Sequence, residues 1–195
     1  GMFPGYFKNS EADKEIFDET GEWICTGDLG SIDEDGFLKI IGRKKELIIT
    51  STGKNIVPTK IEDKINSSNC ISQSMLVGEG KSYCNALVTL NTAEVLQVFP
   101  QLSHVFSADE LNQLQKNVAT ETVVKKLAES KEVVDLLRTH IDIINEDLNR
   151  TEQIKKIKIL FREFSMENNE LTPTMKIKRN VIVEKFSEEI EKLYM

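Results

Sequence analysis

The chain has 195 residues, of which 39% are hydrophobic and 29% are charged, and its formal net charge is −7. This composition is typical of a soluble globular protein with enough apolar residues to bury a core. The negative net charge and a pI of about 5.1 argue against a nucleic-acid surface, because a phosphate backbone requires a basic face.

The first quarter of the chain is expected to be loops and short strands. Turn-forming residues are frequent over residues 3–30. The Asp-Gly pair at 35–36 predicts a tight hairpin turn, because glycine readily adopts the positive φ that such a turn needs. This turn joins strand 29–32 to strand 37–41.

A further strand at 47–50 and a polar turn at 51–55 come next, and a short helix follows them. Thr59 and Glu62 have the spacing of a capping box, which predicts a helix start at Thr59. Isoleucines on every fourth position, Ile61 and Ile65, mark its buried side.

Two strands, 74–77 and 86–90, are predicted beyond this helix, with a glycine-containing loop between them. Two paired strands beside a helix favour an α+β fold with a small sheet that helices cover on one side. The pattern over 93–150 is then helical, and Ser107 with Glu110 forms a second capping box.

Within this helical stretch, apolar residues recur every three or four positions, which predicts the core face of one long helix. A coiled coil would need more heptads. The residues of this stripe are Val134, Leu137, Ile141, Ile144 and Leu148.

The last part of the chain is predicted to contain a strand at 154–161, a polar loop at 167–170 and an amphipathic terminal helix at 181–193. Three cysteines and two histidines offer no metal-ligand spacing, so no metal site is expected. The cysteines, which we expect to be reduced and buried, are Cys25, Cys70 and Cys84.

The stretch LTPTMKIKRN at 171–180 allows two interpretations. In the first it is a short edge strand, with Met175 and Ile177 on one face and solvated lysines on the other. In the second, a loop holds Lys176 and directs it at an anion.

Three stretches, taken together, carry a resemblance: TGDLG at 26–30, GRKKELIITSTGKNIVPTKIE at 42–62 and LTPTMKIKRN at 171–180. In this order and spacing they resemble the adenylate-forming enzymes, which include acyl-CoA synthetases, luciferases and peptide-synthetase adenylation domains. The chain looks most similar to long-chain fatty acyl-CoA synthetases. The resemblance covers nearly the whole chain and is least firm over 93–150.

This resemblance implies a chemistry and a domain organisation. The family couples ATP to a carboxylic acid, releases pyrophosphate, and passes the acyl group from the adenylate to the thiol of coenzyme A. Residues 1–44 would be the β-rich tail of the large N-terminal domain, and 45–195 the small mobile C-terminal domain. The family's phosphate loop, which usually ends in Pro-Lys-Gly, is not found in these residues.

The chain is therefore expected to be a fragment that is inactive alone, with the missing N-terminal domain as its partner. Mg-ATP would be held mainly by that domain, and fatty acid, ATP and coenzyme A would be the substrates. We expect a cytoplasmic location, and a fatty substrate is compatible with peripheral contact at the inner face of a membrane. No secretory leader or membrane-spanning run is recognisable.

The resemblance assigns nucleotide contacts to Asp28 and Arg43. Asp28 matches the aspartate that holds the ribose hydroxyls, and an ionised carboxylate can accept from both hydroxyls at once. Arg43 matches an arginine near the ribose or phosphates, where its planar fork of donors is suited to bind. The simpler alternatives are a turn aspartate and a surface arginine.

Two further assignments concern movement and coenzyme A. Lys45 matches the hinge about which the C-terminal domain pivots, with Lys44 as the alternative if the register differs by one. Ser51, Thr52 and Gly53 match the loop that lines the pantetheine channel after rotation, although Gly53 also has a simpler role in the turn itself.

Lys176 matches the lysine of the family's last motif, which reaches the reacting carboxylate and the α-phosphate. An ammonium placed there would stabilise the charge that is redistributed in the transition state. Lys178 and Arg179 are expected at its margin as surface or phosphate-side charges. Met175 stands where many members have glycine, a departure that the fatty-acid branch tolerates.

The sequence thus predicts the C-terminal portion of an ATP-dependent long-chain fatty acid–CoA ligase, with Lys176 as its catalytic residue. A ligase for a different carboxylic acid is one alternative, because the acid pocket lies outside the chain. A non-catalytic interaction or regulatory module of the same fold is another. The combined presence of Asp28, Arg43 and Lys176 argues against the module.

Overall fold

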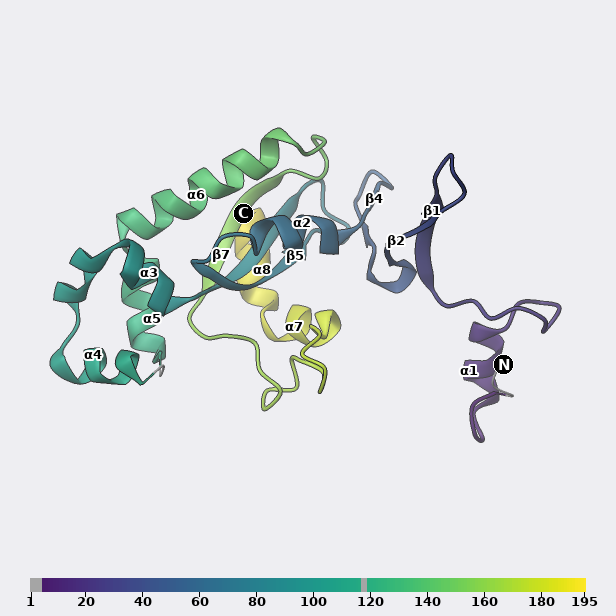
Figure 1. The fold of residues 1–195 in the computed structure, drawn as a ribbon, viewed down its shortest axis with the longest axis horizontal. Coiled ribbons are helices and arrows are strands. Elements are labelled where there is room, and N and C mark those ends of the chain that lie inside the picture. The colour runs from purple at the N-terminus through teal and green to yellow at the C-terminus, as the bar shows by residue number, and fades with distance from the viewer. Residues whose placement is uncertain (1–4, 117–118) are drawn as a thin grey trace. The chain divides into compact units, whose positions relative to one another are not determined.

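The structure is a computed structural model that describes residues 5–116 and 119–195 (Figure 1). The chain divides into two compact units, Gly1–Leu47 and Ile48–Met195. Each unit has its own secondary structure.

The first unit contains the predicted hairpin. Strands β1 (Asp28–Ile32) and β2 (Leu38–Arg43) pair antiparallel, and the turn between them places Gly36 at φ 87°. The 3-10 helix η1 (Lys44–Glu46) follows β2. Helix α1 (Ser10–Ile16) was not predicted, since loops and short strands were expected over residues 3–30.

The second unit is built around a three-stranded sheet in the order β5-β6-β7. Strands β5 (Ile71–Val77) and β6 (Cys84–Leu90) pair antiparallel, whereas β6 and β7 (Ile154–Leu160) pair parallel. A parallel pair requires a crossover, and helices provide it here. They are α3 (Thr92–Val98), η2 (Pro100–Val105), α4 (Ala108–Gln115), α5 (Glu121–Ala128) and α6 (Lys131–Glu146).

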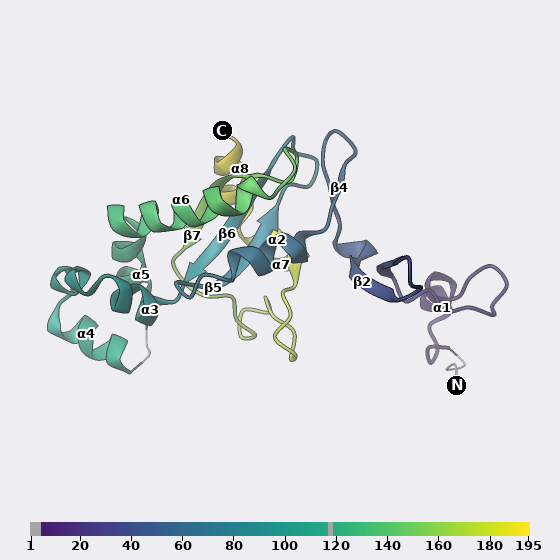
Figure 2. The ribbon, with the colours of Figure 1, turned by 45° about the horizontal axis from the view of Figure 1, so that its top comes forward.

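Helices cover both faces of this sheet, not one face as predicted. Successive residues of β5 point to opposite faces, so Leu76 joins one hydrophobic cluster and Met75 the other. The cluster of Leu76 includes residues of α2 (Pro58–Ile65), α5 and α6, and α6 extends beside the sheet (Figure 2). The cluster of Met75 includes residues of α7 (Arg179–Lys185) and α8 (Ser187–Tyr194). Both faces of the sheet are therefore enclosed.

The predicted capping box at the start of α2 is wrong. The helix begins at Pro58 after Val57, and no side chain caps its first turn. Proline suits this position because its φ is already helical and it lacks an N–H group that would need a partner. The carboxylate of Glu62 instead accepts a hydrogen bond from the Leu76 N–H in β5. Ile61 and Ile65 are buried, as predicted.

The second capping box is confirmed at the start of α4. The Ser107 N–H donates to Glu110 Oε2 at 2.7 Å, and the Glu110 N–H donates to Ser107 Oγ at 3.3 Å. In α6 the predicted stripe is partly right. Val134 is 39% exposed and Val133 is buried in its place, whereas Leu148 lies beyond the helix end. The buried stripe consists of Val133, Leu137, Ile141 and Ile144.

The C-terminal helix differs from the prediction because it is broken in two. Phe186, with φ −108° and ψ 25°, leaves the helical conformation between α7 and α8. Cys70 and Cys84 are buried as predicted, and burial raises the pKa of Cys84 to about 11. Cys25 is exposed, so its predicted burial is wrong. Within the described residues, no helix has the length and apolar character needed to cross a bilayer.

Candidate functional site

Asp28 and Arg43 lie together in the first unit. They are partners across the β1–β2 ladder, and Arg43 Nε donates to Asp28 Oδ1 at 2.9 Å. The hydrogen bond from Arg43 to this carboxylate raises the pKa of the arginine. The Asp28 side chain is 30% exposed and the Arg43 side chain is 59% exposed, so both remain accessible to a ligand.

The predicted hinge residue also belongs to the first unit. Lys45 lies in η1, and its Nζ is 2.7 Å from Glu15 Oε2 in an exposed ion pair. The neighbouring Lys44 N–H donates to the Gly27 carbonyl at 2.8 Å. Both side chains are exposed, and solvent weakens the attraction between such charges, so the Lys45 contact would not hold the backbone in one conformation.

Ser51, Thr52 and Gly53 form the tip of a short hairpin in the second unit. The hairpin consists of β3 (Ile48–Ile49) and β4 (Asn55–Ile56). Gly53 has φ 74°, which favours glycine, and its N–H donates to the Thr50 carbonyl at 2.9 Å.

This tip is held at its base. The Ser51 N–H donates to the Lys81 carbonyl in the β5–β6 turn at 2.9 Å, and the Gly80 N–H donates to the Ile49 carbonyl at 2.8 Å. The three tip residues are exposed. The loop is therefore attached to the sheet while its tip faces solvent.

Lys176 lies in a tight turn, so of the two interpretations of residues 171–180 the edge strand is wrong and the loop is right about the backbone. Only an isolated bridge joins Leu171 to Ile177. The Thr172 N–H donates to the Lys176 carbonyl at 2.8 Å, and the Lys176 N–H donates to Thr172 Oγ1 at 3.0 Å. Met175 has φ 62°, the left-handed conformation that explains why glycine would suit this position. We call residues 171–177 the lysine turn.

The side chain of Lys176 is exposed. In the part of the chain that the structure describes, no hydrogen bond or ion pair involves its Nζ. The backbone of this residue is thus fixed while its ammonium group faces solvent. Lys178, two residues further on, instead donates from Nζ to Asn169 Oδ1.

Arg179 corrects a prediction. It was expected as a surface or phosphate-side charge, but its side chain is only 17% exposed and forms an ion pair with Glu62, whose side chain is 8% exposed. The sequence alone did not reveal this pair, because the two residues lie 117 positions apart. Arg179 is consequently not available to bind a phosphate in this structure.

Glu170, just before the lysine turn, was also missed. Its side chain is 0% exposed, and its oxygens accept hydrogen bonds of 2.7 Å from Arg162 Nη1 and Nη2. Burial raises the pKa of Glu170, but the hydrogen bonds from Arg162 and from the Ser165 N–H outweigh this effect and leave the pKa lowered. The only available signal was a glutamate next to an apolar residue, Leu171, at the end of a polar loop.

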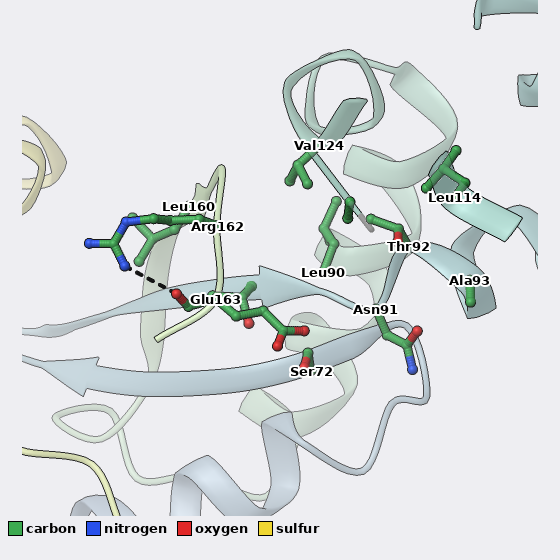
Figure 3. A pocket seen from close by; sticks show the side chains of 12 residues that line it. Ser72, Leu90, Asn91, Thr92, Ala93, Leu114, Val124, Leu160, Arg162 and Glu163 are labelled. Carbon is green, nitrogen blue, oxygen red and sulfur yellow. Dashed lines mark hydrogen bonds between the residues drawn. The ribbon is translucent and has the colours of Figure 1, made fainter. Parts of the chain in front are cut away.

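A pocket of about 440 Å³ opens in the second unit, among α3, α4, α5 and the strand ends (Figure 3). Leu90, Val124 and Leu114 form part of its apolar wall, and Glu163 contributes a carboxylate. Arg162 lines it too, but the guanidinium is committed to Glu170 and to the Glu163 carbonyl. None of the predicted site residues lines this pocket.

The described residues contain no group of three or more histidine, cysteine or carboxylate side chains that could hold a metal ion. They also contain no hydrogen bond between the Ser51–Gly53 loop and the lysine turn. Asp28, Arg43 and Lys45 belong to the first unit, whereas Ser51, Thr52, Gly53 and Lys176 belong to the second.

Curated relatives match the chain along almost its whole length. It is 37% identical over 193 residues to the long-chain-fatty-acid–CoA ligase FadD15 of Mycobacterium tuberculosis, covering 99% of this chain and 30% of that protein. It is 34% identical over 197 residues to the long-chain-fatty-acid–CoA ligase ACSBG2 of Gallus gallus, covering 99% of this chain and 26% of that protein. The chain therefore spans less than a third of the length of these relatives.

A solved structure has the same fold. The A domain of a carboxylic acid reductase from Segniliparus rugosus, in complex with AMP and a co-purified carboxylic acid, superposes with a TM-score of 0.73 at 24% identity, covering 98% of this chain and 26% of that one. The expected α+β fold and the expected resemblance to adenylate-forming enzymes are both confirmed. The profile of one family, described as the AMP-binding enzyme C-terminal domain, matches residues 45–119 and 118–195. The chain belongs to this family of AMP-binding enzyme C-terminal domains.

Proposed function

We propose that the chain is the C-terminal part of an ATP-dependent long-chain fatty acid–CoA ligase. One observation carries the proposal: the lysine turn fixes the backbone of Lys176 and leaves its ammonium exposed and unpaired within the described residues. The similarity to ligases named for long-chain fatty acids supports this acid over other carboxylic acids.

In the adenylation step, Lys176 would act on two anions. A carboxylate oxygen attacks the α-phosphorus of ATP, a new P–O bond forms, and the bond to the leaving pyrophosphate breaks. Lys176 would contact the carboxylate and the α-phosphate, so its positive charge would offset the repulsion between them. An ammonium group suits this role because it is a compact point charge.

Asp28 and Arg43 would bind the nucleotide. Asp28 can accept hydrogen bonds from the ribose hydroxyls, and its partner Arg43 would contact the ribose or phosphate region. Their ion pair supports the proposal, because it places an acceptor and a donor fork side by side at an accessible surface. Magnesium would accompany ATP, held mainly by the N-terminal domain that the relatives' greater length implies.

In the second step, the acyl group passes from the adenylate to the thiol of coenzyme A, and AMP leaves. The exposed Ser51–Gly53 loop would line the pantetheine channel, since Gly53 presents bare backbone to a thin ligand. Lys45 would be the hinge between the two steps, which places the domain boundary between residues 44 and 45. We also propose a cytoplasmic location, with peripheral membrane contact where the fatty acid is taken up.

The test uses the full-length enzyme, meaning this chain preceded by a large N-terminal domain. Lys176→Ala should lower pyrophosphate release in the adenylation step by about a hundred- to thousand-fold. Thioester formation from supplied acyl-adenylate should stay largely unchanged. Lys178→Ala is the matched control, because this nearby lysine is already engaged by Asn169.

Equal loss of both half-reactions in Lys176→Ala would contradict the assignment. Comparing acids of different chain length in the same assay separates a fatty-acid ligase from a ligase for another acid. The isolated chain should show no turnover and only weak ATP binding by calorimetry, and micromolar affinity there would be inconsistent with the proposal.

A further inference from the structure

We propose that Glu62 and Arg179 are positioning residues that hold the backbone of Lys176 for the adenylation step. The inference rests on the proposed function of Lys176. Neither residue would contact the substrate, since both side chains are largely buried. They would act through the chain segment that links Arg179 to the lysine turn.

The pair is integrated into the edge of the sheet. Glu62 Oε1 accepts the Leu76 N–H at 2.6 Å, and Glu62 Oε2 pairs with Arg179 Nη2. Arg179 Nη1 donates to the Leu76 carbonyl at 3.3 Å. Because β5 is an outer strand, Leu76 finds partners for both backbone groups in these two side chains. The pair therefore joins α2, β5 and the first residue of α7.

This anchor lies three residues after Lys176, on the C-terminal side of the lysine turn. On the other side, Glu170 is fixed by Arg162, and its carbonyl accepts the Lys178 N–H at 2.8 Å. Both ends of the lysine turn are thus attached to the interior, and only its tip is exposed. An arginine at 179 that merely solvated the surface would leave the C-terminal end with the Lys178–Glu170 hydrogen bond but without a link to β5 and α2.

A buried ion pair alone is weak evidence for a stabilising role, because desolvation of the two charges offsets much of their attraction. Its geometric effect is more specific: a carboxylate and a guanidinium held by hydrogen bonds on both sides allow little movement of the attached backbone. A displacement of about 1 Å at a reacting group can cost about 100-fold in rate. Lys176 has a long flexible side chain, so fixing its Cα narrows the region that its ammonium can reach.

The proposal predicts an effect on one half-reaction only. In the full-length enzyme, Arg179→Met and Glu62→Gln should each lower kcat for pyrophosphate release by about 30- to 100-fold, with KM for ATP nearly unchanged. Thioester formation from supplied acyl-adenylate should change less than about threefold. Arg179→Lys should restore part of the adenylation rate, because it keeps the charge but loses the second donor.

A matched control is the ion pair between Lys126 and Glu110 in the helical crossover. It is also part-buried but more exposed than the Glu62–Arg179 pair: its Nζ lies 2.8 Å from Oε2, and the Lys126 and Glu110 side chains are 38% and 16% exposed. Glu110→Gln removes a comparable interaction away from the lysine turn. It should leave both half-reactions nearly unchanged.

A second readout does not depend on activity. In the 195-residue chain, the Lys176 N–H is hydrogen-bonded to Thr172 Oγ1, so its hydrogen exchange reports the order of the lysine turn. Glu62→Gln, which keeps the side-chain shape, and Arg179→Lys should accelerate this exchange by about tenfold, and Glu110→Gln should not.

The outcomes separate the two proposals. Loss of adenylation in Lys176→Ala but not in Arg179→Met would overturn the inference and leave the proposed function standing. Retained adenylation in Lys176→Ala would overturn both. Equal loss of the two half-reactions in Arg179→Met and Glu62→Gln, or unchanged exchange at Lys176, would show that the pair is merely structural and would also overturn the inference.

Discussion

The carboxylate of Glu170 accepts two hydrogen bonds of 2.7 Å from the guanidinium of Arg162, one on each oxygen. Glu170→Gln would remove the negative charge that pairs with Arg162. It would also replace one of the two acceptor oxygens by an NH2 group, which donates and cannot accept from the guanidinium. Because the Arg162 side chain is 41% exposed and water can solvate its charge, we expect a loss of about 1 to 3 kcal/mol in the free energy of unfolding, measured by urea titration. Glu163→Gln, at an exposed neighbour, should change it by less than about 0.5 kcal/mol. A loss of the same size in both variants would contradict this account.

The ionisation of the Glu170 carboxylate should make the stability of the fold depend on pH. The pKa of Glu170 is lowered from 4.5 in the folded chain, so folding favours its ionised form. Its contribution is therefore fully present above pH 4.5 and is lost as the pH falls through the folded pKa. Unfolding curves between pH 7 and pH 3 should show stability falling more steeply in the parent chain than in Glu170→Gln. Parallel curves would indicate that other groups cause the acid sensitivity.

Met175 offers a test of backbone strain. Its φ is 62°, and its side chain is 62% exposed, so it contributes little packing. Met175→Gly should relieve strain worth about 1 kcal/mol, partly offset by the greater entropy of glycine in the unfolded chain. Met166→Gly, at another exposed methionine of the same region, should not raise the free energy of unfolding. Adenylation activity should persist in Met175→Gly, and a large loss would mean that the methionine side chain itself has a role.

The two roles considered for Gly53, in the turn and in the coenzyme A channel, can be tested separately. A Cβ at this position would meet no atom within 4 Å, so the positive φ alone determines the cost of a substitution. Asparagine tolerates this conformation, whereas valine does not. Gly53→Asn should therefore keep the stability within about 1 kcal/mol but raise KM for coenzyme A by obstructing the channel. Gly53→Val should both raise KM for coenzyme A and lower the free energy of unfolding. An unchanged KM in a folded Gly53→Asn enzyme would leave glycine with a turn role only.

Local signals predicted local structure well. The Asp-Gly pair at 35–36 gave the hairpin turn, and Ser107 with Glu110 formed the expected capping box. Thr59 and Glu62 have the same spacing and failed, because the interior competes for the carboxylate of Glu62. A sequence motif specifies what a side chain can reach within one turn, and it does not include a stronger partner from elsewhere in the fold.

For the candidate site too, sequence motifs predicted some residues, whereas residues that depend on long-range contacts were missed or misjudged. Asp28, Arg43 and Lys176 were proposed from motifs that resemble those of a known family, and the accessible positions of all three are compatible with the proposal. Glu170 was not proposed, and Arg179 was wrongly expected as a surface or phosphate-side charge, because the roles of both residues depend on partners that only the folded chain brings together. The partner of Arg179 lies 117 residues away, a distance over which no periodicity or spacing carries information.

The parallel pairing of β6 with β7 has a consequence for the order of folding. Asn85 Oδ1 accepts the Lys156 N–H across 71 residues of sequence, and the whole helical crossover must be closed before this contact forms. Closing so long a connection is slow compared with forming the local β5–β6 hairpin. Lys176 comes after β7 in the chain. The lysine turn is bordered by Glu170, whose partner Arg162 lies just beyond β7, so we expect this end of the turn to be fixed only after β7 has joined the sheet.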